Sequence, residues 1–235
     1  MINSSSNQSS TPNSTSGAPV TNVIYSANLP STNIYLGTNQ TGVVTGTYGY
    51  VSVGGGTLKG TGTIGNLFMS LGVVAPGMSP GILNAGPTQF SGGTYQEELG
   101  GTAAGAFDQL NVTGTVDLGI NTTVLDTSIY GTFKPVAGDS FMIIKNDLAD
   151  ATGGTFKGLA EGATFTVSGY VFKISYVGSD GNDVVLSVQS VPALPKTGFS
   201  LPLANAYLVL IAAISMASVI GFAAWKLSAT DNHLI

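Results

Sequence analysis

The stretch Gly54-Gly55-Gly56-Thr57-Leu58-Lys59-Gly60-Thr61-Gly62-Thr63-Ile64-Gly65 decides the expected fold of this chain. It places two large apolar residues, Leu58 and Ile64, among glycines and threonines. Threonine favours strands, and glycine permits the tight turns between them. The unit Gly-Gly-Thr-apolar occurs at 55–58, 92–95 and 153–156. Repeated short strands with glycine corners are typical of a β-solenoid, in which each coil buries its apolar face against its neighbours.

Runs of β-branched and aromatic residues continue on both sides of this stretch. They are 21–25, 33–36, 43–45 and 48–53 before it, and 111–113, 115–118, 122–125, 140–145, 164–167, 170–176 and 183–188 after it. No amphipathic helix of credible length precedes residue 200. The pattern predicts an all-β fold, which could be a sandwich, a barrel or a solenoid. The repeats favour the solenoid.

The composition excludes several kinds of site. Among 235 residues there are 33 glycines, no cysteine, no arginine, and only 8% charged residues. Without cysteine there is no disulfide framework and no thiolate ligand or nucleophile. The net charge of −5 argues against nucleic-acid binding, because reading phosphates requires clustered Lys and Arg.

Three motifs carry a family resemblance. They are Gly55–Ile64, Ala75-Pro76-Gly77-Met78-Ser79-Pro80-Gly81, and Phe107-Asp108-Gln109-Leu110-Asn111-Val112-Thr113-Gly114. In this order they resemble the passenger region of autotransporter and filamentous adhesins, over residues 54–188. The resemblance implies the last coils of a right-handed parallel β-helix and the β-rich cap that closes it. Those families continue into an outer-membrane barrel, whereas this chain carries an LPxTG segment.

We divide the chain into five segments on this basis. They are a Ser/Asn/Thr-rich segment 1–19, solenoid coils 20–110, a β-rich cap 111–188, a linker 189–198, and a transmembrane helix with a short tail 199–235. Residues 1–19 hold too few apolar side chains to offset the entropy of ordering, which predicts disorder. They also lack the basic and apolar regions of a secretory signal. The chain is therefore expected to be the C-terminal piece of a longer protein, or to have a misassigned start.

Leu194, Pro195, Lys196, Thr197 and Gly198 match the LPxTG pattern of sortase substrates. The resemblance implies cleavage between Thr197 and Gly198 by a sortase-type transpeptidase. The cysteine of that enzyme would take the Thr197 acyl group and pass it to an amine of the cell-wall peptidoglycan. The expected location is the cell surface.

Residues 204–225 are predominantly apolar and uncharged, and about 20 such residues span a bilayer. Trp225 at the end is typical of an interfacial anchor. Sorting signals usually end in several basic residues, but here only Lys226 is basic and Asp231 is acidic. Two outcomes stay open: a cleaved, wall-linked product, or a permanent single-pass membrane anchor.

Two stretches with acidic residues could indicate an active site or a calcium site. Glu97 and Glu98 are adjacent on an expected strand, so they point to opposite faces and cannot act as one pair. Asp108 or Asp117 from a neighbouring coil could complete a site, although a structural role is favoured. Asp180-Gly181-Asn182-Asp183 resembles one turn of a calcium-binding β-roll, yet calcium needs several such copies. We interpret it as a turn between strands.

Tyr25, Tyr35, Tyr48 and Tyr50 could stack on sugars or on a protein partner. Ordinary stacking within a solenoid is the alternative for each of them.

The function expected from the sequence is that of a surface-displayed adhesin-like or structural protein, without catalytic residues, cofactor or bound metal. Its glycan or protein ligand is not identified by any motif. The alternative is a C-terminal fragment of a polysaccharide-acting β-helix enzyme whose catalytic coils are missing. A purely structural stalk is a third hypothesis.

Overall fold

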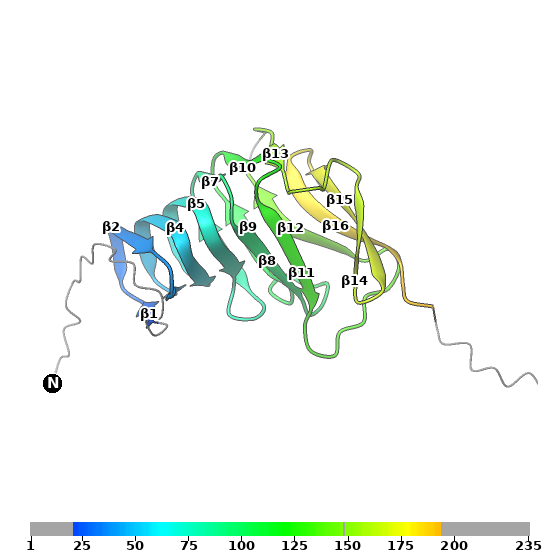
Figure 1. Ribbon diagram of the computed structural model, residues 1–235, viewed down its shortest axis with the longest axis horizontal. Helices are drawn as coiled ribbons and strands as arrows, with labels where there is room; N and C mark the ends of the chain where they lie inside the picture. Colours follow the sequence, from blue (N-terminus) through cyan, green and yellow to red (C-terminus); the bar gives the residue numbers. More distant parts are fainter. Residues whose placement is uncertain (1–20, 148, 194–235) are drawn as a thin grey trace, which may run out of the picture. The chain divides into compact units, whose positions relative to one another are not determined.

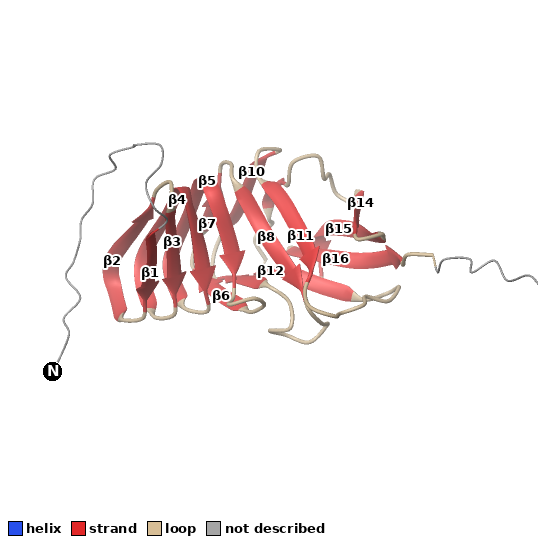
Figure 2. Ribbon diagram, turned by 60° about the horizontal axis from the view of Figure 1, so that its bottom comes forward, coloured by secondary structure: helices blue, strands red, loops and turns tan. Residues whose placement is uncertain are grey.

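The computed structural model describes residues 21–147 and 149–193, and within these residues it contains strands and no helix (Figures 1 and 2). The strands are β1 Thr21–Tyr25, β2 Asn28–Leu36, β3 Gln40–Val44, β4 Thr47–Gly60, β5 Thr63–Pro76, β6 Ile82–Ala85, β7 Thr88–Phe90, β8 Thr94–Leu99, β9 Gln109–Val112, β10 Val116–Ile120, β11 Val124–Ile129, β12 Ser140–Asn146, β13 Gly153–Thr155, β14 Thr164–Val167, β15 Tyr170–Gly178 and β16 Asp183–Ser190. They belong to one sheet that is mostly parallel. The all-β prediction is confirmed.

Parallel pairing stacks successive coils into three ladders. The first ladder contains β2, β4, β5, β7, β10 and β13; the second contains β1, β3, β4, β5, β8 and β11; the third contains the first residues of β2, β4 and β5, followed by β6, β9 and β12. The long strand β4 contributes to all three ladders, because 47–48 and 50–53 pair with the two parts of β2 and 57–60 pairs with β3. This is a solenoid-like arrangement.

The coils lengthen along the chain, which explains why the sequence repeat is irregular. In the first ladder, Val51 pairs with Leu67, Leu67 pairs with Thr88, and Thr88 pairs with Val116. Each of these steps spans a longer piece of sequence than the step before it. The additional sequence is inserted between the second and third ladders, for example between β8 and β9.

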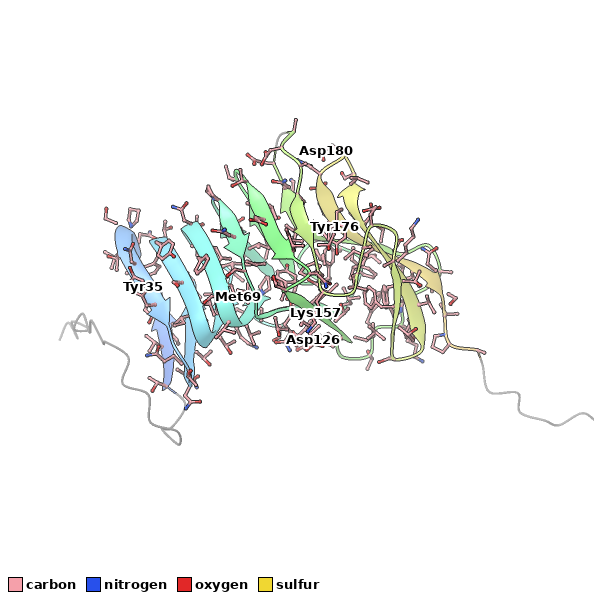
Figure 3. The ribbon with its side chains drawn as sticks, turned by 45° about the horizontal axis from the view of Figure 1, so that its top comes forward. Tyr35, Met69, Asp126, Lys157, Tyr176 and Asp180 are labelled. Atoms are coloured by element: carbon pink, nitrogen blue, oxygen red, sulfur yellow. The ribbon has the colours of Figure 1, made fainter. Side chains whose placement is uncertain are left out.

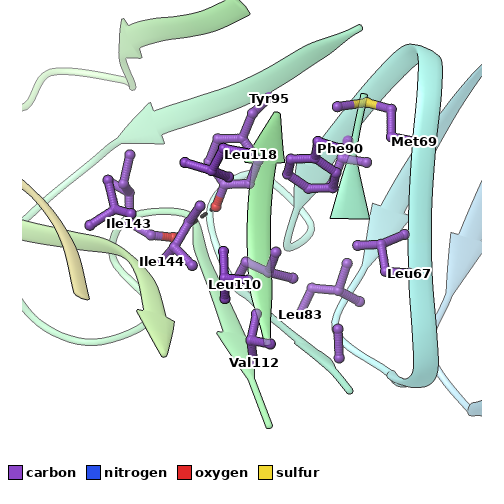
Figure 4. Packing of buried hydrophobic residues seen from close by; sticks show 14 of the residues in the cluster. Leu67, Met69, Leu83, Phe90, Tyr95, Leu110, Val112, Leu118, Ile143 and Ile144 are labelled. Carbon is purple, nitrogen blue, oxygen red and sulfur yellow. Dashed lines mark hydrogen bonds between the residues drawn. The ribbon is translucent and has the colours of Figure 1, made fainter. Parts of the chain in front are cut away.

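The core is built of columns of apolar side chains that repeat from coil to coil. Leu36, Val53, Met69 and Phe90 occupy paired positions in β2, β4, β5 and β7, and all four are buried. A further column consists of Leu83, Leu110 and Ile144 in β6, β9 and β12 (Figure 4). Burying one such side chain contributes about 1.5–3 kcal/mol, so the columns stabilise a fold that has few charges.

The three Gly-Gly-Thr-apolar units place their apolar residues in this core. Leu58, Tyr95 and Phe156 are all fully buried. The rings of Tyr95 and Phe156 have centroids 5.8 Å apart, and the Tyr95 hydroxyl donates a hydrogen bond of 2.7 Å to the Ile143 carbonyl oxygen (Figure 4). The repeated unit therefore marks a buried position in the coil.

Gly72 shows why the corners of the coils require glycine. Its φ is +85°, in the region that L side chains rarely adopt. A Cβ at this position would overlap the carbonyl oxygen of Gly56 in the coil before it. The close approach of successive backbones thus excludes a side chain here.

At the C-terminal end the pairing becomes antiparallel. The strands β12, β16, β15 and β14 are joined in this order, while parallel pairing extends past residue 110 as far as β13. Tyr176 joins the two regions: its hydroxyl donates to the Leu159 carbonyl oxygen at 2.7 Å and accepts from the Phe156 N–H at 2.9 Å. Burial raises the pKa of Tyr176 to about 12. These strands cover the end of the core.

Several sequence predictions concern residues outside the described ranges. They are the disorder of 1–19, the LPxTG motif at 194–198 and the apolar segment 204–225. Within the described part, the chain has no helix whose length and hydropathy would suit a membrane span.

Candidate functional site

The four tyrosines separate into an inner pair and an outer pair. The rings of Tyr25 and Tyr48 lie edge to face with centroids 5.6 Å apart, and Tyr48 is buried. Tyr35, labelled on β2 in Figure 3, is 65% exposed. Its ring centroid lies 6.1 Å from that of Tyr50 in the next coil. Of the four rings, that of Tyr48 is buried, those of Tyr25 and Tyr50 are partly exposed, and that of Tyr35 is the most exposed.

Tyr35 and Tyr50 belong to two columns of side chains on the outer face of the first ladder. One column consists of the paired residues Tyr35, Ser52, Phe68, Gln89 and Asp117. The other contains Tyr50 and Asn66, followed in later coils by Pro87 and Thr115. The residues between them, such as Val51 and Val116, are buried, so alternation along each strand turns both columns outward.

A groove of about 440 Å³ lies along these columns. It crosses four successive coils, from Tyr50 on β4 through β5 and β7 to Asp117 on β10. The side chains of Asn66, Gln89, Thr115 and Asp117 are exposed, whereas Tyr50 and Phe68 are half-buried. Leu67 and Thr88 also line it.

The groove combines two kinds of group. Tyr50 and Phe68 provide aromatic surfaces, while Asn66 and Gln89 each provide a donor and an acceptor. Asp117 adds a carboxylate, whose Oδ1 accepts the Gly119 N–H at 2.9 Å. The lining contains no lysine or arginine. Such a surface fits a ligand that has both apolar ring faces and hydroxyl groups.

Asp108 does not line the groove, and its contacts indicate a structural role. It is 1% exposed, and its carboxylate accepts the Gly81 N–H at 2.9 Å and the Glu98 N–H at 3.1 Å. It thereby links the Ala75–Gly81 segment to β8. Burial raises the pKa of Asp108 from 3.8 to about 7; the charge of Glu98 adds to this, and the two backbone donors and Lys59 oppose it.

Glu97 is the most unusual polar group in the described chain. It is fully buried beside Tyr95 and Leu99 on the inner face of β8, and neither carboxyl oxygen has a hydrogen-bond partner among the described residues. Burial, followed by the negative charges of Asp108 and Glu98, raises the pKa of Glu97 well above its usual value, and the nearby backbone N–H of Asp108 opposes this shift. The buried site therefore favours the neutral, protonated form of this carboxyl group.

Glu97, Glu98 and Asp108 lie close together in the structure. Glu97 and Asp108 are buried, so a substrate could not reach their carboxyl groups. Glu97 and Glu98 lie on opposite faces of β8, as predicted, because only Glu97 alternates with buried residues. Asp117 belongs to the groove on the first ladder. Its pairing with Gln89 and Gly153 places it on a different face from β8.

Asp180–Asp183 forms the turn expected between strands. The chain turns between β15 and β16, with a hydrogen bond from the Gly181 N–H to the Gly178 carbonyl oxygen at 2.8 Å. Asp183 is buried and accepts the Asn146 N–H at 2.9 Å, which ties the turn to β12. Among the described residues, no three acidic or histidine side chains gather closely enough to hold a metal ion.

Sequence reasoning found Tyr35 and Tyr50 but missed Asn66, Phe68 and Gln89. These three residues become neighbours of Tyr50 only through pairing between coils of unequal length. One feature of the sequence could have indicated them: each lies next to a residue that is buried in the core, either Leu67 or Thr88, and therefore points outward. The sorting residues Leu194, Pro195, Lys196, Thr197 and Gly198 lie outside the described ranges.

No family model matches this chain, and no curated protein and no solved structure is significantly similar to it.

Proposed function

We propose that this chain is an adhesin-like protein displayed on a cell surface. In this proposal residues 21–193 form the coils and cap of a right-handed parallel β-helix, and the C-terminal segment anchors them. A sortase-type transpeptidase recognises Leu194–Gly198, cleaves between Thr197 and Gly198, and joins Thr197 to peptidoglycan. The segment 204–225 holds the chain in the membrane before this step.

The observation that carries the proposal is the position of the last described strand relative to the motif. The last strand, β16, ends at Ser190, and Val191–Ala193 are exposed and belong to no strand. A transpeptidase needs an accessible peptide, and Pro192 and Pro195 disfavour helix in the residues before them. The motif at 194–198 follows these exposed residues directly in the sequence, and this position supports its assignment as a sorting signal.

Fractionation of the native host tests the proposal. We expect the chain in the cell-wall fraction of a strain that contains its sortase. In the deletion strain we expect it in the membrane fraction or the medium. The variant Thr197→Ala should behave in the parent strain as the unchanged chain does in the deletion strain, because it removes the residue whose acyl group is transferred.

Lys196→Ala is the matched control, since the third position of LPxTG accepts different residues. This variant should remain in the wall fraction. If the unchanged chain stays in the membrane fraction of both strains, the segment 204–225 is a permanent anchor and wall coupling is wrong. If it stays in the cytosol of both strains, surface display itself is wrong.

A further inference from the structure

We propose that the groove on the outer face of the first ladder binds a neutral glycan chain that lies along the stacking direction of the coils. The proposal rests on the proposed function, since it gives the adhesin-like protein its ligand class. It assigns ring stacking to Tyr50 and Phe68. It assigns hydroxyl recognition to Asn66, Gln89 and Asp117.

Aromatic rings and amides together select a sugar. Tyr50 and Phe68 lie in adjacent coils and present half-exposed rings to the groove. Pyranose rings have one apolar face of C–H bonds, which packs on an aromatic face, and a rim of hydroxyls. Each hydroxyl donates and accepts, and the amides of Asn66 and Gln89 do the same.

The charge of the groove favours a neutral chain over an anionic one. Asp117 is exposed, and the groove has no lysine or arginine to pair with a uronate or sulfate. The chain as a whole carries a net charge of −5. A glycan with acidic groups would therefore meet repulsion without compensation.

The geometry of the ladder fits a repeating ligand. Neighbouring strands lie about 4.8 Å apart, which is comparable to the length of one sugar unit in an extended chain. The groove crosses β4, β5, β7 and β10, so consecutive sugars can meet equivalent positions of consecutive coils. A peptide strand lacks this match, because its side chains alternate in direction and the ladder face offers no free strand edge.

Calorimetric titration of the purified full-length chain with neutral hexasaccharides tests this assignment. Cellohexaose, xylohexaose, mannohexaose and chitohexaose are the probes, and a hexamer of galacturonic acid is the anionic comparison. We expect at least one neutral probe to bind and the galacturonate hexamer not to bind. Tyr50→Ala and Phe68→Ala should each weaken binding about tenfold or more, as expected for the loss of one stacking contact.

Tyr130→Ala is the control, because Tyr130 is 43% exposed and does not line the groove. It should leave the affinity unchanged. Gln89→Ala should also weaken binding, and since Gln89 is exposed, this variant tests the groove without disturbing the core. Absence of binding by all four neutral probes, or equal affinity in the Tyr50, Phe68 and Gln89 variants, would overturn the proposal. Preference for the galacturonate hexamer would do the same. None of these results depends on sortase, so failure here leaves the outcome of wall fractionation unaffected.

Discussion

At the scale of single residues, the neighbours Glu97 and Glu98 show how alternation on a strand gives identical side chains different roles. Glu98 lies on the partly exposed face of β8, whereas Glu97 is enclosed by the core without a hydrogen-bond partner among the described residues. A buried polar group without a partner costs about 1–3 kcal/mol. Glu97 is thus expected to lower the stability of the fold.

Glu97→Met should raise the free energy of unfolding at pH 7 by about 1–3 kcal/mol, because methionine has a similar shape and no polar atom to desolvate. Gln96→Met, an uncharged position on the partly exposed face of the same strand, is the control and should change it by less than about 0.5 kcal/mol. Urea unfolding of the two variants measures the difference. Destabilisation by Glu97→Met would mean that the carboxyl group makes a stabilising contact.

The raised pKa of Asp108 predicts how stability depends on pH. The folded chain holds this proton up to about pH 7, whereas the unfolded chain releases it near the ordinary value of 3.8. The folded state therefore binds more protons between these values, and stability falls as pH rises from about 4 to about 7. The slope approaches about 1.4 kcal/mol per pH unit for this one group.

Glu97 should also make the free energy of unfolding fall as pH rises, because its pKa is raised in the folded chain as well. Urea unfolding midpoints between pH 4 and pH 8 measure the combined effect, and Glu97→Met should make the dependence shallower. A midpoint that increases with pH over this window would contradict the assignment of both groups. Glu98 and Lys59 face Asp108 and act on its pKa in opposite directions, since the first charge raises it and the second lowers it.

At the scale of strands, the sequence predicted where the strands lie along the chain far better than which strands pair with one another. The runs 21–25 and 164–167 coincide with β1 and β14, because β-branched and aromatic residues make up nearly all of both runs. The pairing of β7 with β10 was not predictable, because it depends on insertions that lengthen each coil by a different amount. The groove depends on that pairing, so its residues escaped prediction for the same reason.

Two leucines on β5 test the alternation that creates the core columns. Leu67 is 1% exposed and pairs with Val51 and Thr88, whereas Leu71 is 62% exposed. Leu67→Ala should lower the free energy of unfolding by about 2–5 kcal/mol, because it leaves a cavity between two coils. Leu71→Ala should change it by less than about 0.5 kcal/mol. Equal effects in thermal or urea unfolding would contradict the register of β5.

At the scale of the whole molecule, the described residues form one mostly parallel sheet whose later strands turn antiparallel and cover the core. Leu58 and Ile64, in the stretch that decided the expected fold, are both fully buried in this sheet. Asp108 gives a physical reason for two of the resemblance motifs to occur together, since its carboxylate binds the Gly81 N–H of the other motif. The proposed anchoring is a separate claim that rests on residues beyond this sheet.

Mass spectrometry of the wall-released protein tests that claim most directly. A protease that cleaves after acidic residues cuts at Asp183, and the next acidic residue is Asp231. Our account predicts a peptide that begins at Val184 and ends at Thr197, with the Thr197 carboxyl joined to an amine of peptidoglycan. A peptide that runs unbroken from Val184 through Gly198 to Asp231 would contradict it.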